Sequence, residues 1–482
     1  MTQSALARKT IGTLGLTGAG ISASSPVTVV AGGIVATYAS TGVAGLPLAV
    51  VLLGGALLLL TVGYLALAAR TGQAATFYGV LADGLGRAAG VSGAFVAVVA
   101  YTAIQVSLYG LFGAVVAASV GGPWWVWAAV GWAVVAIAGL RQVTAGTRII
   151  ASVLVCQLAV LALLVATAVT NPAGGQLAVA GFAPSALLVD GWGGVLALSI
   201  AAFIGIESPT TYAEEARTGR AVATAVRAGV IAAAIGYALC AWAIGVAVGP
   251  DQLGDPAAMA GQPWQILADR YGPILPAVAG LILAAGIVTA MIALHAVSAR
   301  YLFALGRDRV VPTVFAATTT AGAPVGGSLA QTSVAGAVIA GTAWIDADPM
   351  LLFTSLSSLA AVAIVALLTT TSVAAICAGV RDRGRDSTPN AWWTFGVGPA
   401  LGTAAGACLL VVVVGNLHLM LGVTADSSLR HVIPACVVLA ALAGLVWATV
   451  LRYRQPAVYA AIGAGRPDPL TVPDRRLAPL EL

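Results

Sequence analysis

The stretch Phe203-Ile-Gly-Ile-Glu-Ser-Pro-Thr-Thr211 places a glycine, a carboxylate and a proline inside an otherwise apolar run. A second stretch, Gly18-Ala-Gly-Ile-Ser-Ala-Ser-Ser-Pro-Val-Thr28, interrupts another apolar run in the same way. Proline removes a backbone donor and clashes with the preceding turn, and glycine weakens a helix further. Both stretches therefore predict helices that are broken near their middles.

The rest of the chain is strongly apolar. Charged residues make up 8% of the 482 residues and hydrophobic residues 60%, whereas a soluble domain is about 25% charged. So few charges cannot cover a surface that faces water. We expect an all-α polytopic membrane protein, with the lipid bilayer as its surroundings and no nucleic-acid partner.

Twelve apolar stretches are long enough to cross about 30 Å of hydrocarbon. They lie at residues 14–37, 43–69, 91–119, 123–140, 149–170, 193–213, 224–249, 273–299, 328–344, 350–378, 395–415 and 433–451. The connections at 171–192 and 250–272 and the tail from Arg452 to Leu482 are expected to be loops or disordered ends, which leaves no extramembrane domain.

The basic residues separate between alternate connections. With the N-terminus inside, twenty of them fall on the cytoplasmic side, and only Arg270 and Arg430 fall outside. This bias predicts that both termini are cytoplasmic and that the protein lies in the cytoplasmic membrane of the cell. Arg8-Lys9 ahead of the first apolar stretch also fits a cleaved signal peptide, but the loop charges favour a retained helix.

The two interrupted stretches align with each other. Superposing Ser25-Pro26 on Ser208-Pro209 also superposes Ile21 on Ile204. Five spans separate the copies, and an odd number inverts the second copy across the membrane. Paired interruptions at matching positions of two inverted halves indicate the binding site of a secondary transporter. Two kinked packing helices are the alternative.

An unwound stretch survives in lipid only where it faces protein, water or a ligand. Freed N–H groups at the start of a half-helix favour an anion such as a carboxylate, and freed carbonyl groups favour an ammonium group or a metal cation. Glu207 adds an acidic side chain at the second break. We expect it to be an amine partner or a proton carrier, the alternative being a structural carboxylate bonded to the backbone of the first break.

Other polar side chains also lie inside predicted spans. Tyr101, Gln105 and Tyr109 form a stripe on one helix face, which either lines a substrate path or ties neighbouring helices together. His295 is either a proton relay or a histidine bonded to a neighbouring helix. Gln157 is the only strongly polar side chain in the fifth span.

Two acidic residues lie near the cytoplasmic end of the sixth span. Glu214 and Glu215 neighbour Arg217 and Arg220 in the sequence. We expect these four residues to form a solvated charge cluster.

Several classes of function are not expected. The sequence contains no H-E-x-x-H, G-x-S-x-G or P-loop motif, which argues against an enzyme and an ATP-driven pump. Its five cysteines lack C-x-x-C spacing and predict neither a disulfide framework nor a zinc site. We expect no catalytic residue, no cofactor and no metal. A cation channel or ion importer would need a ring of acids or a filter loop, and only Glu207 fits.

Three segments resemble motifs of the amino acid–polyamine–organocation (APC) superfamily, of the amino acid permease type. Phe203-Ile-Gly-Ile-Glu-Ser208, leading to Glu214-Glu-Ala-Arg217, resembles its sixth-helix motif. Ser298-Ala-Arg-Tyr-Leu-Phe-Ala-Leu-Gly-Arg-Asp308 resembles its eighth-helix motif, and Gly18-Ala-Gly-Ile21 its first-helix element. With the twelve-span plan, the similarity covers most of the chain.

The resemblance implies a five-plus-five inverted repeat in which helices 1 and 6 are broken, followed by two further helices. The first repeat would then comprise residues 14–170 and the second 189–378, with helices 11 and 12 at 395–451. Residues 1–13 would be a cytoplasmic N-terminus and 452–482 a cytoplasmic tail.

The resemblance also implies roles for residues at the two breaks. The residues expected to meet a substrate carboxylate are Ser22, Ala23, Ser24 and Ser25, and those expected around its amine are Phe203, Gly205, Ile206, Glu207 and Ser208. Tyr101 and Gln105 complete the substrate-binding candidates, and the candidates for coupling are Glu207, Gln157 and His295.

Two departures from the family pattern affect these roles. Ala201 replaces a gating aromatic residue found in some relatives, which implies a roomier pocket or a gate moved to Phe203. Certain proton-coupled relatives use a fifth-helix lysine, where this chain offers only Gln157. We expect a secondary transporter of an amino acid or a small, polyamine-like amine, driven by a proton or another coupling ion. Proton-coupled uptake is the leading mechanism, with substrate exchange and potassium import as alternatives.

Overall fold

The structure, a computed structural model, describes residues 11–72, 74, 76–140, 143–319, 322–382 and 390–463, and of 143–147 the backbone alone. Its helical elements, in which η denotes a 3-10 or π-helix, are α1 (Thr13–Ser24), α2 (Pro26–Thr28), η1 (Val29–Ile34), α3 (Val35–Thr41), α4 (Leu46–Thr71), α5 (Thr76–Leu85), α6 (Arg87–Val120), α7 (Trp124–Leu140), α8 (Val143–Thr170), η2 (Ala180–Phe182), α9 (Pro184–Leu187), α10 (Trp192–Ile200), η3 (Ala201–Phe203), η4 (Ser208–Tyr212), α11 (Gly219–Val248), η5 (Pro250–Gln252), α12 (Pro256–Met259), α13 (Trp264–Tyr271), α14 (Ile274–Arg307), η6 (Thr313–Ala316), α15 (Val325–Trp344), α16 (Pro349–Arg381), η7 (Trp393–Val397), α17 (Gly398–Gly415), α18 (Leu417–Leu421), α19 (Leu429–Arg454) and α20 (Pro456–Ala461).

Ten helical segments in the described residues are long and apolar enough to cross a membrane. Each coincides with one of the predicted spans, which confirms a multi-pass membrane protein. The remaining two predicted spans coincide with α7 and α15, which are not among the ten. Helix α7 is too short, with 17 residues, and α15, with 20 residues, is less apolar than the ten. The count of twelve spans and the inverted repeat stay predictions.

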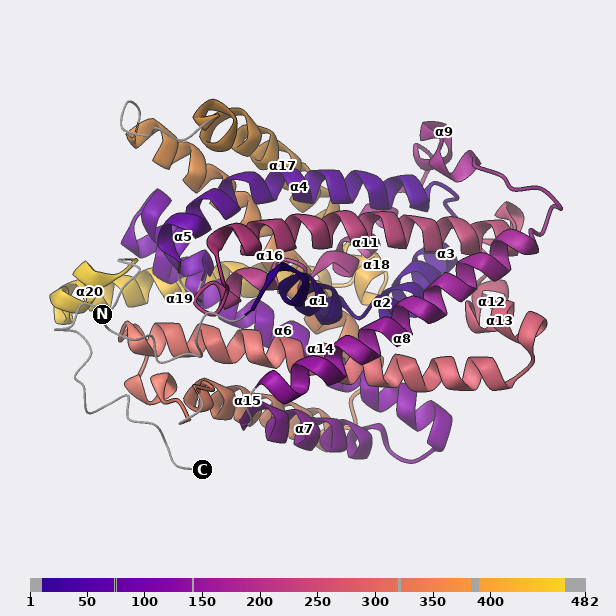
Figure 1. Ribbon diagram of the computed structural model, residues 1–482, viewed down its shortest axis with the longest axis horizontal. Coiled ribbons are helices and arrows are strands. Elements are labelled where there is room, and N and C mark those ends of the chain that lie inside the picture. Colours follow the sequence, from indigo (N-terminus) through magenta and orange to yellow (C-terminus); the bar gives the residue numbers. More distant parts are fainter. Residues whose placement is uncertain are drawn as a thin grey trace.

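The long helices lie side by side along the long axis of the molecule (Figure 1). Helix α6 is the most deeply buried of the ten spans, whereas α19 is the least buried. Small residues let neighbouring backbones approach α6 closely. A methyl group built at Gly110 would lie 2.7 Å from the carbonyl oxygen of Pro349, and one at Gly113 would lie 2.5 Å from that of Trp124.

The two ends of the bundle carry different elements. Helices α5 and α20 lie at one end, and α9, α12 and α13 lie at the other (Figure 1). The two connections, 171–192 and 250–272, and the described part of the tail each contain a short helix, so the prediction of loops or disordered ends is wrong there. Helix α13 is held to the bundle by Leu267, whose side chain is fully buried.

Parts of the predicted plan fall outside the described residues. They include residues 1–10 of the N-terminus and 464–482 of the tail. The basic residues of the positive-inside prediction that lie there or in the internal gaps are Arg8, Lys9, Arg141, Arg383, Arg385, Arg466, Arg475 and Arg476.

Candidate functional site at the two helix breaks

The first predicted break is confirmed at Ser25. This residue has a left-handed backbone conformation, with φ 47° and ψ 83°, and separates α1 from α2. Pro26 takes the first position of the second half-helix, where its missing N–H has no partner to lose. The chain then widens into the π-helix η1, a form that is frequent at functional sites.

The second break lies between Phe203 and Ser208. Helix α10 ends at Ile200 and tightens into a 3-10 turn, after which Ile204 is extended. Gly205 follows with φ +93°, a conformation that side chains other than glycine rarely adopt. The chain resumes only as the 3-10 helix η4, so the prediction of an interruption is confirmed here too.

The two breaks touch each other. A methyl group built at Gly205 would lie 2.9 Å from the Cβ of Ala23. A methyl group at Gly20 would lie 3.0 Å from Cγ of Pro209 and 3.2 Å from the carbonyl oxygen of Ile206. Glycine on each side is therefore what allows the two interrupted helices to come into contact.

Glu207 lies buried at the centre of the second break, with 5% of its surface exposed. One carboxylate oxygen accepts a hydrogen bond from the Tyr101 hydroxyl at 3.1 Å, and the other accepts the Gly205 backbone N–H at 3.0 Å. The carboxylate therefore accepts a hydrogen bond from the backbone of its own break. It does not bond the backbone of the first break, which was the alternative considered for this residue. Among the described residues no basic side chain forms an ion pair with it.

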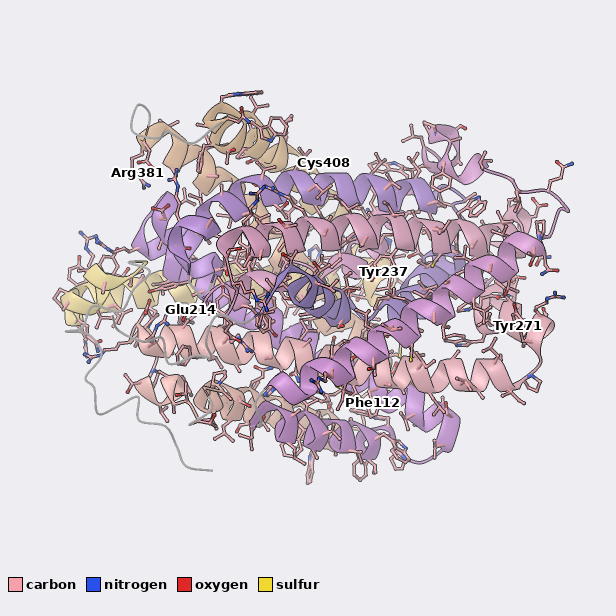
Figure 2. All side chains as sticks on the ribbon, in the orientation of Figure 1. Phe112, Glu214, Tyr237, Tyr271, Arg381 and Cys408 are labelled. Atoms are coloured by element: carbon pink, nitrogen blue, oxygen red, sulfur yellow. The ribbon has the colours of Figure 1, made fainter. Side chains whose placement is uncertain are left out.

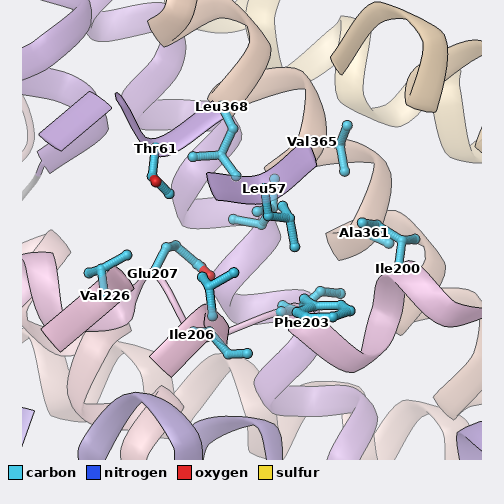
Figure 3. Close-up of a pocket in the computed structure, with 13 residues that line it drawn as sticks. Leu57, Thr61, Ile200, Phe203, Ile206, Glu207, Val226, Ala361, Val365 and Leu368 are labelled. Atoms are coloured by element: carbon cyan, nitrogen blue, oxygen red, sulfur yellow. The ribbon is translucent and has the colours of Figure 1, made fainter. Parts of the chain in front are cut away.

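Two cavities are lined in part by residues around the second break. The smaller, of about 20 Å³, is lined by Phe203, Glu207, Leu57 and other largely apolar side chains. Figure 3 shows the Glu207 carboxyl group among these apolar neighbours. Phe203 also packs edge-on against Tyr237, with their ring centroids 6.1 Å apart.

The larger cavity has a volume of about 90 Å³. The first broken helix contributes lining residues that include Ala23, Ser24 and Thr28. The segment that leads into the second break contributes Ala201 and Ala202 of η3. Ala201, the position considered for a gating aromatic residue, is small and lines this cavity beside Ala202, which fits the roomier-pocket alternative. A space that holds one water needs only about 10–15 Å³ of such volume, so this cavity has room for a small solute.

The polar stripe of α6 holds helices together. Gln105 donates to the Tyr109 hydroxyl at 2.6 Å and accepts from Gln331 of α15 at 2.9 Å. Neither Tyr101 nor Gln105 lines either cavity, whereas Ile104 of the same helix lines the larger one. The geometry thus matches the alternative in which this stripe ties neighbouring helices together.

Gln157 of α8 meets the first break. Its side-chain oxygen accepts from the Ser25 hydroxyl at 3.2 Å and from the Val27 N–H at 3.3 Å. Ser25 also shares a hydrogen bond of 2.8 Å with Thr28. The Gln157 amide nitrogen and the Ser22 hydroxyl are buried and find no hydrogen-bond partner in the residues that the structure describes, and neither residue lines a described cavity.

His295 belongs to α14, and its side chain lines neither described cavity. Its Nε2 shares a hydrogen bond of 2.8 Å with the Ser328 hydroxyl of α15, while Nδ1 is buried and has no hydrogen-bond partner among the described residues. His295 is therefore bonded to a neighbouring helix, which was the alternative to a role as a proton relay.

The prediction of a solvated charge cluster at Glu214 and Glu215 is wrong. Glu215 forms a two-pronged ion pair with Arg300, at 2.6 and 3.1 Å, and both residues are buried. Glu214 pairs in the same way with Arg307, at 2.9 and 3.0 Å. Both partners come from the C-terminal end of α14, so the sequence neighbours of the two glutamates did not reveal them.

Figure 2 shows that Glu214 lies nearer than Tyr237 to the end of the bundle that carries α5.

The same end of the molecule is closed by further contacts. Ile11 exchanges two backbone hydrogen bonds with the segment after η4, through Glu215 and Arg217. Asp308 accepts a hydrogen bond of 3.1 Å from the Tyr78 hydroxyl. Burial raises the pKa of the Asp308 carboxyl above its ordinary value, although the Arg307 guanidinium acts in the opposite direction.

Several residues near the cavities were not expected from the sequence. Tyr237 of α11 shares a hydrogen bond of 2.8 Å with Ser24, and Phe353 and Ser357 of α16 line the larger cavity. Tyr64 of α4 shares a hydrogen bond of 2.7 Å with Thr210. Their helices show no interruption of the kind seen at the breaks, so only the tertiary arrangement reveals these side chains.

One comparison with known proteins gives a match. A family model described as amino acid permease matches residues 11–453, which includes both breaks and nearly all of the described chain. No curated protein matches the sequence.

Replacing Gly205 by alanine tests the contact between the breaks. The added methyl group would collide with Ala23, and an alanine at this position would have to keep an unfavourable positive φ. We therefore expect the free energy of unfolding to fall by about 1–3 kcal/mol. The thermal midpoint of the purified protein measures it. Gly236→Ala in α11 is the matched control, because nothing lies within 4 Å of a methyl group there. Equal midpoints for both variants would contradict the close contact.

Removing one partner of the buried ion pair tests the closed end of the molecule. Arg300→Gln leaves Glu215 buried without its cation, and we expect a loss of about 3–5 kcal/mol in stability. The control is Arg381→Gln, since that side chain is 51% exposed and such pairs contribute about 0–1 kcal/mol. The double variant Arg300→Met with Glu215→Met should recover part of the loss. Failure of Arg300→Gln to lower the thermal midpoint further than Arg381→Gln would contradict a buried pair.

Proposed function

Since the chain belongs to the amino acid permease family, we propose that it is a secondary transporter that carries an amino acid across the cytoplasmic membrane by alternating access. The observation that carries the proposal is the contact between two interrupted helices beside a cavity of about 90 Å³. Irregular backbone inside a membrane is tolerated where it lines such a cavity, and transporter sites are built at these places.

The two breaks offer opposite partial charges to a bound amino acid. The half-helix after Ser25 starts at the cavity, where Thr28 is part of the lining, and a helix start favours a carboxylate. Helix α10 ends at the same cavity, lined by Ser199 and Ala201, and a helix end favours an ammonium group. This arrangement supports an α-amino acid more strongly than an amine without a carboxylate.

The positions of the larger cavity and of the buried ion pairs support a conformation in which the pathway is closed on one side of the membrane. The larger cavity is lined by Ala23 and Ser24 at the end of α1 and extends along the half of the first broken helix that follows the break, as far as Thr37. The buried ion pairs of Glu214 and Glu215 lie beyond the other half. With the cytoplasmic termini that the basic residues predict, the closed side is the cytoplasmic one. Transport then requires these ion pairs to separate.

Glu207 is the residue through which we propose that a proton acts. It is a buried carboxylate at a break, and no basic side chain among the described residues forms an ion pair with it. Proton-coupled uptake follows if this carboxylate gains and loses a proton during the cycle. Exchange is the second candidate, because Gln157, the nearest candidate in this chain to the fifth-helix lysine of some relatives, is neutral and already bonded to the first break.

Glu207→Gln tests the coupling. We expect the variant to fold and insert, because an amide oxygen can still accept from the Gly205 N–H. Uptake of a radiolabelled amino acid into proteoliposomes should fall or lose its pH dependence between about pH 5 and 8. Counterflow with unlabelled amino acid inside the vesicles measures exchange in the same preparation.

Asp426→Asn is the control, because it neutralises an exposed carboxylate far from the breaks in sequence. Uptake by Glu207→Gln that matches the unmodified protein at every pH would remove Glu207 from the mechanism. Transport of putrescine or potassium without any amino acid would overturn the proposed substrate and favour an amine or ion importer.

A further inference from the structure

In the described part of the chain, the larger cavity is lined without any charged side chain. The lining residues are aliphatic, aromatic, small or hydroxyl-bearing, and the elements that supply them are α1, α2, η1, α3, α4, α6, α10, η3, α11 and α16. Glu207 does not line it. A charge buried inside a membrane protein without a partner is costly, so this lining discriminates against a ligand with a third charged group.

Most of the hydroxyl groups around the cavity are already bonded within the protein. Thr37 donates to the Gly33 carbonyl and Ser357 to the Phe353 carbonyl, each at 2.7 Å. Ser24 donates to the Ile21 carbonyl at 2.8 Å and shares a second hydrogen bond with Tyr237. The hydrogens of these hydroxyl groups are already donated, so the groups offer a ligand only acceptor lone pairs.

Ser199 is different from these hydroxyl residues. It lies in the last turn of α10, lines the cavity and is 6% exposed. Its hydroxyl oxygen is buried and has no hydrogen-bond partner in the described part of the chain. A buried hydroxyl without a partner is energetically unfavourable, and a ligand in the cavity would supply the missing hydrogen bond.

We propose that this cavity binds an α-amino acid whose side chain is uncharged and apolar, and that the Ser199 hydroxyl hydrogen-bonds the bound amino acid. The inference rests on the proposed function and deepens it by naming the class of substrate. Ala201 and Ala202 leave space for a side chain, and Ile104, Leu108 and Phe353 supply apolar contacts. Each methylene that fills this space strengthens binding through the burial of apolar surface.

A ligand panel on the purified, full-length protein tests the substrate class. Thermal stabilisation is titrated with L-alanine, L-valine, L-leucine, L-arginine, L-glutamate and putrescine. We expect affinity to rise from alanine to leucine, and arginine and glutamate to bind about tenfold or more weakly than leucine. Arginine or glutamate binding as tightly as leucine would overturn the inference and leave amino acid transport intact. Binding of putrescine alone, or of none of these compounds, would overturn the transport proposal itself.

Two serine variants test the role of Ser199. Ser199→Ala removes a hydroxyl from the cavity, whereas the control Ser333→Ala removes an exposed hydroxyl of α15 that bonds its own helix and lines neither cavity. We expect Ser199→Ala to raise the dissociation constant for leucine about three- to tenfold, and Ser333→Ala to leave it nearly unchanged. The thermal midpoint without ligand shows that both variants fold. Equal dissociation constants for the two variants would remove Ser199 from the site.

Space in the cavity is tested by Ala202→Leu. This substitution fills part of the volume and should weaken leucine binding more than alanine binding. Ala159→Leu, at an exposed position of α8, is the matched control and should leave both unchanged. An equal loss for both ligands in Ala202→Leu would indicate general damage to the site and would contradict a side-chain pocket there.

Discussion

Unpaired backbone groups are the constraint on which this structure depends, since lipid offers them no hydrogen bonds. A helix can be interrupted inside the membrane only if the protein meets the groups that the interruption exposes. Gln157 accepts the Val27 N–H at the first break, and Glu207 accepts the Gly205 N–H at the second. Glycine at positions 20 and 205 lets the two interrupted helices meet, so each break also shields the other.

The second break also connects the cavities to the closed end of the bundle. Only the short helix η4 separates Glu207 from Glu214 and Glu215, which are held by Arg307 and Arg300. A ligand that changes the backbone at Gly205 therefore acts close to the residues that must separate if that end is to open. In the transport cycle that we propose, binding and opening would thus be linked over a short distance, with no need for a distant relay.

The sequence predicted the all-helical membrane-protein class and the two breaks because both follow from local composition. Long apolar runs specify helices in lipid, and Ser-Pro with nearby glycine specifies an interruption. It misassigned Glu214 and Glu215 because their partners, Arg300 and Arg307, lie far away in the chain and meet them only through packing. Ser199 and Tyr237 went unnoticed for the same reason, since an isolated hydroxyl in a transmembrane helix has no distinctive sequence pattern.

Amide hydrogen exchange with and without a bound amino acid tests the central claim most directly, namely that the two contacting breaks form one binding site. If they do, the ligand slows exchange in the segment around Ser25 and in the segment around Gly205 together, with helix ends such as that of α19 unchanged. Protection confined to one break, or located only outside both, would contradict a shared site.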